Sequence, residues 1–399
     1  MSRVLVLNTG SSSIKYRLFD MGGRAVLASG LLERIGEETS RLTHWTEGAD
    51  PLVVDRRVAD HQEGLDAIFE ALGSSSGLSA GLAAIGHRVV HGGEQFSTPA
   101  VIDDKVVEAI RELIPLAPLH NPGNLLGIET ARAAFPAIPQ VAVFDTAFHR
   151  TMPPRAYRYA LPRDLADRLR IRRYGFHGTS HAYVSREAAR HLGRPLAEVN
   201  LVTMHLGNGA SVAAVAGGRS VDTSMGLTPL EGLVMGTRSG DLDPAIVFFL
   251  HREAGLAFDE IETLLNQESG MKGLAGANDM REVERRAAGG DDLAREALDV
   301  YCYRLRKYVA AYAAVLGGVD ALVFTAGVGE NSHTVRASVC SGLECLGVRV
   351  DDARNQVRSQ RPRTVSSDDS TVAVLVVPTN EELEIAEQTL AAIGDRRAS

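Results

Sequence analysis

The chain repeats one strand–loop–strand pattern in its two halves, and this repeat restricts the folds that the chain can adopt. In the first half, the apolar run 4–7 leads into the polar loop 8–13, and a second apolar run follows. In the second half, the run 201–205 leads into the small-residue loop 207–211, followed by the run 212–216. Two copies of one strand-based unit are the simplest explanation. The sequence therefore predicts a duplicated fold.

Apolar strands and helical periodicity alternate around these two loops. Strands are predicted at residues 14–19, 25–31, 83–90, 140–144 and 372–377. Helices are predicted at residues 62–72, 104–116, 123–135 and 381–393. The expected fold class is therefore α/β, built in layers, with the last helix returning to close the first domain.

A second pair of segments, 141–147 and 321–327, is interpreted as counterparts in the repeat. Each is a buried strand that opens into a loop of small residues at its carboxyl end. Such strand ends are where α/β sheets bind ligands. The consecutive prolines Pro153 and Pro154 stop both helix and sheet, so the hinge between the halves is expected near Met152.

Length and charge limit the possible classes of protein. A chain of 399 residues exceeds what one hydrophobic core usually organises, so two domains are expected. The balance of 42 basic against 50 acidic residues gives a net charge of −8, which offers no electrostatic basis for binding nucleic acid. One basic cluster is interpreted as a solvated helix end; it comprises Arg168, Arg170, Arg172 and Arg173.

Cysteine usage and hydropathy indicate a reducing, cytoplasmic location. Only three scattered cysteines occur, which argues against a disulfide framework or a cysteine-based zinc site. The apolar run 4–7 is too short for a signal peptide. The longest apolar stretch, 308–324, is broken by Gly317, Gly318 and Asp320, and it predicts a helix, a turn and a strand instead of a membrane span.

The repeated loops are candidates for binding phosphate. The chain has neither a G-x-x-x-x-G-K-[ST] motif nor a G-x-G-x-x-G motif after a strand. In the first loop, backbone N–H groups and the hydroxyls of Ser11 and Ser13 are suitable donors to phosphate oxygens, and Lys15 adds positive charge. A serine-rich hairpin turn would look similar, so this loop alone leaves both interpretations open. The matching loop, which contains Gly207, Asn208 and Gly209, favours a phosphate clamp.

A third glycine-rich segment, 325–332, follows a predicted buried strand. Its bare backbone would let a purine and a ribose approach closely. The alternative is an ordinary turn from strand to helix, with Asn331 or Ser332 as the helix cap. Both interpretations remain open from the sequence.

Two arginines and several histidines are candidates for phosphoryl-transfer chemistry. Arg88 ends a predicted strand, and Arg238 lies in a loop too rich in glycine to be a helix. A guanidinium fits phosphate or carboxylate oxygens, although many arginines are only solvated or paired. His177 and His181 lie in a glycine-flanked, turn-like segment and lack the glutamate of a zinc protease motif. A donor to a phosphate oxygen is therefore the expected role for such a histidine.

Magnesium would require oxygen ligands and would keep several waters. Asp145 at a strand end and Glu381 at the start of the last helix are the candidate ligands. Asp241 and Asp243 are weaker candidates, because a Ser-Gly-Asp turn explains them equally well. For Asp145 and Glu381, the alternatives are a loop residue and a first-turn acid that the helix dipole favours.

These motifs together resemble the acetate kinase family along nearly the whole chain. The segments that carry the resemblance are residues 6–15, 87–94, 144–149, 174–181, 205–211, 222–226, 236–244, 325–332 and 380–382. The resemblance implies two duplicated ribonuclease-H-like (actin-like ATPase) domains with a central nucleotide cleft. It assigns residues 1–150 plus 381–399 to the first domain and 151–380 to the second, and it implies a homodimer joined through the second domain.

The resemblance also assigns roles to individual residues. It implies that catalysis involves Arg88, Asp145, His177 and Arg238, and that Asn8 and Glu381 serve the metal. The implied phosphate and nucleotide contacts are Asn8, Ser11, Ser13, Lys15, His205, Leu206, Gly207, Asn208, Gly209, Asp279, Met280, Arg281, Gly327, Val328, Gly329 and Asn331. The implied apolar pocket for the substrate methyl group comprises Val90, Leu119, Phe176 and Pro229.

The implied reaction is reversible, Mg²⁺-dependent transfer of the ATP γ-phosphoryl group to acetate, giving acetyl phosphate and ADP; Mn²⁺ is a possible substitute for Mg²⁺. A propionate or broader short-chain acyl kinase is the nearest alternative, because one methylene changes discrimination by only ~1–3 kcal/mol. A noncatalytic ATP-binding module related to actin or Hsp70 is an alternative from another class. Such a module would not need Arg88, Arg238 and His177 together. Neither a nucleic acid nor a membrane is expected as a partner.

Overall fold

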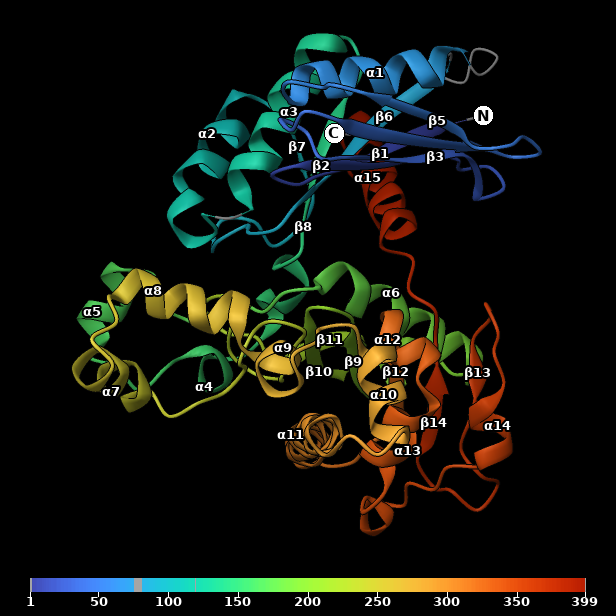
Figure 1. Ribbon diagram of the computed structural model, residues 1–399. Helices are drawn as coiled ribbons and strands as arrows, with labels where there is room; N and C mark the ends of the chain where they lie inside the picture. Colours follow the sequence, from blue (N-terminus) through green and yellow to red (C-terminus); the bar gives the residue numbers. More distant parts are fainter. Residues whose placement is uncertain (1, 75–80, 119, 399) are drawn as a thin grey trace. The chain divides into compact units, whose positions relative to one another are not determined.

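A computed structural model of the chain describes residues 2–74, 81–118 and 120–398. The chain divides into two compact units (Figure 1). The first unit comprises Met1–Ala147 together with Asn380–Ser399, and the second comprises Phe148–Thr379. The carboxyl-terminal segment therefore returns to the unit in which the chain begins.

The first unit is built on a sheet with the strand order β5-β4-β3-β2-β1-β6-β8-β7. Strands β1 to β5 form an antiparallel meander, whereas β6 and β8 run parallel to β1. The strands are β1 (Arg3–Thr9), β2 (Ser13–Asp20), β3 (Ala25–Glu33), β4 (Ser40–Thr46), β5 (Leu52–Arg56), β6 (Leu82–Val89), β7 (Ala100–Val101) and β8 (Gln140–Phe144). The strands predicted at 14–19, 25–31, 83–90 and 140–144 are confirmed, whereas β4 and β5 were not predicted.

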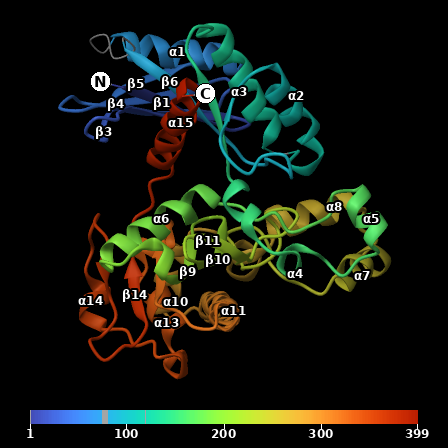
Figure 2. The same cartoon turned by 180° about the vertical axis from the view of Figure 1, so that it is seen from behind.

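Helices cover both faces of this sheet. Figures 1 and 2 show α1 and α3 on one face and α15 on the other. The helices are α1 (His61–Ser74), α2 (Asp104–Glu112), α3 (Asn121–Ala134) and α15 (Glu381–Ala398). The predicted helix 104–116 is shorter than expected, because α2 ends at Glu112 and a separate 3-10 turn, Ile114–Leu116, follows.

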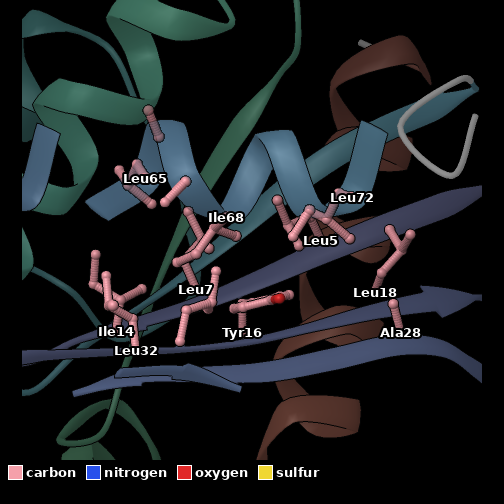
Figure 3. Close-up of a cluster of buried hydrophobic side chains, with 14 of the residues drawn as sticks. Leu5, Leu7, Ile14, Tyr16, Leu18, Ala28, Leu32, Leu65, Ile68 and Leu72 are labelled. Carbon is pink, nitrogen blue, oxygen red and sulfur yellow. The ribbon is translucent and has the colours of Figure 1, made fainter. Parts of the chain in front are cut away.

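The core of the first unit follows from the periodicity of its elements. Leu65, Ile68 and Leu72 lie one helical turn apart and form the buried stripe of α1 (Figure 3). Alternate residues of the strands point at this stripe; they are Leu5, Leu7, Ile14, Tyr16 and Leu18. Burial of each large apolar side chain stabilises the fold by roughly 1.5–3 kcal/mol.

The second unit is built on a sheet with the strand order β11-β10-β9-β12-β14-β13. Strands β9, β10 and β11 form an antiparallel meander, and β12 and β14 run parallel to β9. The strands are β9 (Asn200–Leu206), β10 (Ala210–Ala216), β11 (Arg219–Thr223), β12 (Ala321–Thr325), β13 (Arg363–Thr364) and β14 (Ala373–Val376). The sequence predicted most of β9, β10 and β14.

The two sheets share one topology. The order β3-β2-β1-β6-β8 in the first unit matches β11-β10-β9-β12-β14 in the second, with the same parallel and antiparallel neighbours. The predicted duplicated ribonuclease-H-like α/β fold is therefore confirmed. The pairing of segments 141–147 and 321–327 as counterparts is wrong, because β12 occupies the position of β6, whereas β8 corresponds to β14. Strands β8 and β12 are both fully buried parallel strands with similar sequences, so the apolar pattern alone could not distinguish their positions in the sheets.

Helix α6 covers one face of the second sheet, and the long helix α11 covers the other (Figures 1 and 2). Val184 and Ala188 of α6 pack on the sheet core around Leu201 and Val323. The helices are α4 (Pro154–Tyr157), α5 (Arg163–Arg168), α6 (Gly178–His191), α7 (Ala245–Glu253), α8 (Phe258–Thr263), α9 (Gly270–Ala275), α10 (Met280–Ala288), α11 (Asp292–Leu316), α12 (Ala326–Asn331), α13 (His333–Cys340) and α14 (Asp352–Gln356).

The apolar stretch 308–324 has the structure predicted for it. Helix α11 ends at Leu316, Gly317 adopts the left-handed conformation that terminates the helix, and β12 begins at Ala321. Within residues 2–74, 81–118 and 120–398, no helix has both the length and the apolar character needed to cross a membrane.

The basic cluster differs from its predicted form. Arg168 and Arg170 are exposed, as a solvated helix end requires. Arg172 is instead buried, with its guanidinium carbon 3.6 Å from the centre of the Tyr157 ring. Arg173 forms an ion pair with Glu231 at 2.5 Å. The prediction is therefore wrong for Arg172 and Arg173, because aromatic and acidic partners distant in sequence draw them inward.

Candidate active site

The loop between β1 and β2 closes with a short backbone hydrogen bond in which the Gly10 N–H donates to the Ser13 carbonyl at 2.8 Å. Ser11 is exposed and Ser13 is half-buried, so the two hydroxyls that the sequence singled out lie at the surface of the first unit. Asn8 and Lys15 are partners across the β1–β2 ladder. The loop therefore presents polar groups from both strands at one end of the sheet.

Lys15 is already paired in this structure. Its ammonium contacts the Glu382 carboxylate, which also lies 3.5 Å from Arg17. These cations hold the pKa of Glu382 below its ordinary value, although burial opposes them. Glu382 thus connects β2 to the start of α15. Lys15 is predicted to contact phosphate, and no local pattern in the sequence indicates this partner.

Arg88 and Asp145 form a buried ion pair at the ends of β6 and β8. Arg88 donates from Nε and Nη2 to Asp145 Oδ2, at 2.9 and 2.5 Å. Asp145 is only 1% exposed, and its backbone N–H donates to the Val89 carbonyl at 3.0 Å. Parallel strand ends meet at one edge of a sheet, which is why two residues 57 positions apart come together.

Glu381, the first residue of α15, belongs to the same charged cluster. Burial raises the pKa of Glu381 to about 7, and the neighbouring carboxylates of Asp145 and Glu382 act in the same direction while Arg88 and Lys15 oppose it. The cluster therefore brings three carboxylates, those of Asp145, Glu381 and Glu382, together with the cations Lys15, Arg17 and Arg88. An oxygen-ligated divalent cation has the charge and the ligand chemistry that such a cluster accepts.

The second unit has a contrasting site around the loop between β9 and β10. A side-chain carbon added at Gly209 would lie 3.5 Å from Arg238 Nη1 and 3.5 Å from His177 Nε2. The Gly236 N–H donates to the Asn208 carbonyl at 2.9 Å, and a side chain at Gly236 would collide with the Asn208 amide. Gly209 and Gly236 therefore allow the loop between β9 and β10 and the loop that contains Arg238 to approach each other closely. Both predicted catalytic residues of this unit lie beside the second predicted phosphate loop.

Arg238 is held without an acidic partner among the residues that the structure describes. Its guanidinium donates to the Pro229 carbonyl at 3.3 Å and lies 3.8 Å from the Met235 sulfur. Burial lowers the pKa of Arg238 below its ordinary value. As predicted, its loop, 236–244, is not helical. A partly buried cation without a carboxylate is suited to an anionic ligand.

His177 occupies a strained backbone position at the start of α6. Its φ of 57° is left-handed, which is uncommon for a residue other than glycine. Its ring stacks on His205 with centroids 4.2 Å apart, and its Nδ1 lies 2.9 Å from Ser211 Oγ. His181, predicted in a turn, is instead a buried residue of α6 that also bonds Ser211. The turn expectation was wrong because Gly178 begins the helix.

A cavity of about 960 Å³ in the second unit gathers most of the predicted nucleoside contacts. Its lining includes the predicted residues Gly207, Asn208, Asp279, Met280, Arg281, Gly327, Val328 and Asn331. It also includes residues that the sequence analysis did not assign, among them Met271, Glu284, Tyr301 and Arg358. These four come from helices or loops whose patterns are ordinary, so no local signal marked them.

The glycine-rich segment after β12 forms a short helix, α12, instead of an open loop. Ala326 at its start has a left-handed φ of 62°, and its N–H donates to the Glu330 carboxylate at 2.9 Å. Ser332 is the N-cap of the next helix and accepts from the Val335 N–H at 3.0 Å. The turn-and-cap interpretation therefore describes the local structure, while Gly327, Val328 and Asn331 still line the cavity.

The remaining predicted residues are distributed over both units. Val90, of the first unit, and Phe176, of the second, are buried, and Pro229 is half-buried. Leu119 lies outside the described residues. Leu206 is fully buried, so it contributes to the core behind the second loop. Gly329 lies inside α12, and a side chain there would press on the Phe324 backbone.

The donor groups define a protein that handles phosphate and nucleotide, and comparison with known proteins is consistent with this class. The model of the acetokinase family matches residues 3–387. An acetate kinase from Streptomyces griseus subsp. griseus is 62% identical over 399 residues, covering 99% of this chain and 97% of the relative.

Solved structures agree with the sequence comparison. The crystal structure of Porphyromonas gingivalis acetate kinase has a TM-score of 0.94 and 44% identity, and the match covers 98% of this chain and 100% of that one. A propionate kinase from Francisella tularensis has a TM-score of 0.93 and 43% identity, with 98% and 100% covered. The chain belongs to the acetokinase family, and it is a kinase.

Proposed function

We propose that the protein catalyses reversible transfer of the ATP γ-phosphoryl group to acetate, giving acetyl phosphate and ADP. The acetate carboxylate attacks phosphorus in line, and the bond to the ADP oxygen breaks. Because acetate is already an anion at neutral pH, no general base is required. The task of the protein is to offset the repulsion between carboxylate and phosphate, which arginines and amide donors perform.

The convergence of Arg238, His177 and Asn208 on the loop at Gly209 carries this proposal. The buried guanidinium of Arg238 has no carboxylate partner among the described residues, and it lies beside an imidazole and a bare backbone segment. We assign the transferring phosphoryl group to these donors. Arg88 is assigned to charge neutralisation as well, with Asp145 fixing its guanidinium in one orientation.

ATP is the proposed phosphoryl donor. The cavity lined by Asn208, Asp279 and Gly327 has ample volume for a nucleoside and borders the loop at Gly207. Helix α12 forms part of the wall of this cavity. The Ala326 N–H donates to the Glu330 carboxylate, and the Arg336 guanidinium donates to the Gly329 carbonyl. We assign the nucleoside to this cavity and the phosphate chain to the glycine loop beside it.

The charged cluster of the first unit fits Mg²⁺. Glu381, Asp145 and Asn8 would supply its oxygen ligands, and the carboxylates of Glu381 and Asp145 lie close enough to interact electrostatically. No group of three or more histidine, cysteine or acidic side chains forms a metal cage in the described parts of the chain. This suits Mg²⁺, which keeps several waters and needs only one or two carboxylates. When bound, the ion would neutralise phosphate charge.

The test of the proposed function is ATP-dependent formation of an acyl hydroxamate with acetate, propionate and butyrate in separate reactions. We expect product with acetate and the highest kcat/KM for that acid. A higher kcat/KM for propionate would displace acetate as the substrate. No product from any of the three acids would contradict the kinase assignment and favour a nucleotide-binding module.

A short-chain acyl kinase with propionate as its preferred substrate is the second candidate. The similarity to the Francisella tularensis propionate kinase is nearly as high as that to the Porphyromonas gingivalis acetate kinase. One methylene in an apolar pocket changes discrimination by only ~1–3 kcal/mol, so a small change in pocket shape suffices.

We also propose that the enzyme is a cytoplasmic homodimer joined through its second unit. Helix α7 contains no buried residue, and Ile246, Phe248 and Phe249 are between 41% and 57% exposed. A second copy covering this face would remove that apolar surface from water. Sedimentation of the wild type and of Phe249→Glu tests this: the variant should shift towards monomer, and an unchanged dimer would exclude this face. The three cysteines are free, which suits a reducing compartment.

A further inference from the structure

Strand β1 leads into the proposed phosphate loop, and β6 carries Arg88. The two strands stop pairing with each other before these segments begin. Strands β1 and β6 are parallel neighbours, and their ladder ends at the pair Leu7 and His87. Beyond this pair, β1 continues through Asn8 and Thr9, whereas β6 continues through Arg88 and Val89 and is followed directly by Val90. The β1–β6 register contains no further pair that would fix the separation of Thr9 from Val90.

The side chain of Asn124, in the first turn of α3, bridges this gap. Its Nδ2 donates to the Thr9 carbonyl at 2.7 Å, and its Oδ1 accepts from the Val90 N–H at 3.0 Å. The carbonyl accepts and the N–H donates, so only one orientation of the amide satisfies both contacts. Asn124 is 4% exposed, so water does not compete freely for either bond.

Close packing of α3 against the loop leaves the bridge little freedom. A side-chain carbon at Gly123 would lie 3.0 Å from the Gly10 carbonyl group, and one at Gly127 would collide with Thr9. Both positions therefore require glycine for the helix to approach the loop this closely. From the other side, His61 Nε2 lies 2.7 Å from the Gly10 carbonyl oxygen. The loop backbone is thus held by two helices and by its own turn.

We propose that Asn124 is a positioning residue whose carboxamide replaces the missing ladder hydrogen bonds and fixes the phosphate loop relative to the Arg88–Val90 segment. This inference rests on the proposed function, in which the loop binds phosphate and Arg88 neutralises charge. Loss of either bond would let one segment shift relative to the other. A shift of about 1 Å in such an arrangement costs on the order of a hundredfold in rate.

Asn121 offers a matched control three residues earlier on the same helix. Its amide is also buried, and it also joins one backbone N–H and one carbonyl. Both groups belong to His91, so Asn121 supports one segment and bridges nothing. Asn121→Asp and Asn124→Asp therefore make the same chemical change, and each leaves one backbone carbonyl facing a carboxylate.

The test compares kcat, KM and thermal stability of the two aspartate variants in the full-length protein. We expect similar losses of Tm in both variants, but a loss of kcat of tenfold or more only in Asn124→Asp. KM for ATP should stay within threefold, because the nucleoside cavity belongs to the second unit. A kcat within threefold of wild type for Asn124→Asp, or an equal loss in Asn121→Asp, would overturn the inference.

A second variant and a second readout keep the test decisive. Asn124→Ser removes the bridge without burying a charge, so it replaces Asn124→Asp if that variant does not fold. Amide hydrogen exchange reports on the bridge without any acyl transfer. Exchange should accelerate at both Val90 and Gly10–Ser13 in Asn124→Ser, and unchanged exchange at both would overturn the inference. A wild type without hydroxamate activity would instead contradict the proposed function alone.

Discussion

The two units share one sheet topology but differ in how the cationic side chains at their candidate sites are paired. In the first unit, Arg88 is paired with Asp145, and Lys15 contacts Glu382. In the second unit, Arg238 is partly buried with no carboxylate partner among the described residues, and its guanidinium donates to the Pro229 carbonyl. The first copy of the duplicated fold therefore presents cations paired with carboxylates. The second copy presents a cation that has no carboxylate partner among the described residues.

This difference suggests a division of labour between the copies. A cluster that contains carboxylates suits a divalent cation, whereas donors without carboxylates suit the anionic phosphoryl group. The same strand ends serve both purposes, because side chains at the carboxyl edge of a sheet change without disturbing its core.

Turnover should depend heavily on both arginines. Arg238→Ala and Arg88→Ala are each expected to reduce kcat by about a hundredfold or more, as loss of a preorganised charge-stabilising donor does elsewhere. Steady-state hydroxamate formation measures this effect, and Arg41→Ala, at a surface pair with Asp55, is the control. Near-normal turnover in both Arg88→Ala and Arg238→Ala would refute their assignment.

The free energy of unfolding should distinguish the Arg88 variant from the Arg238 variant. Arg88→Ala removes the cation that forms an ion pair with the 1% exposed Asp145 carboxylate, which should lower the free energy of unfolding by about 3–5 kcal/mol. Arg238→Ala leaves no charge unpaired and should change this free energy by less than about 1 kcal/mol. Urea unfolding of the two variants measures both values. Equal losses would mean that the contrast between the units is wrong.

Acid should destabilise the first unit through its buried histidines. Burial lowers the pKa of His87 to about 4, so below pH 6.5 the unfolded chain binds a proton that the folded chain does not. Stability therefore rises with pH between about 4 and 6.5, and this residue alone should account for about 2 kcal/mol between pH 5 and 7. In His87→Gln, the difference in unfolding free energy between these pH values should shrink by that amount. An unchanged difference would exclude His87 as a source of this pH dependence.

Backbone strain should be measurable in the second unit. Ala326 adopts a left-handed φ of 62°, which costs an alanine roughly 1–2 kcal/mol. Ala326→Gly relieves this strain, but it adds flexibility to the unfolded chain, so a net gain of about 0.5–1 kcal/mol is expected. Thermal unfolding checks this gain against Ala337→Gly in the ordinary helix α13, which should destabilise. A loss of stability in Ala326→Gly would show that the position is unstrained.

Much of the fold was predictable because its signals are local. Apolar runs joined by glycine and serine loops identified β1, β2, β9 and β10, and the repeat identified the duplication. Strand β4 was missed because two of its three buried positions, Ser40 and His44, are polar, and β5 was missed because it contains no fully buried residue. Helix α12 was not predicted as a helix because it contains two glycines. Side-chain contacts of Glu330 and Arg336 hold it in place, and one of them, from the Thr379 N–H to Glu330, spans 49 positions.

The sequence singles out candidate site residues but not the contacts between them. Arg88 and Asp145 were both singled out, yet their ion pair depends on the neighbouring strands β6 and β8. Asn124 carries no catalytic signature, and its role follows only from the point at which the β1–β6 ladder ends. Positioning residues of this kind depend on tertiary geometry, which local patterns do not contain.

The central claim is that arginines and loop amides carry a direct transfer to acetate without a covalent phosphoenzyme. The stereochemical course at phosphorus tests it most directly, using ATP whose γ-phosphorus is chiral through oxygen isotopes and sulfur, with acetate as acceptor. A single in-line displacement predicts inversion of configuration in the acyl phosphate product. Retention would require two displacements, with a phosphorylated side chain such as His177 between them, and would contradict the account.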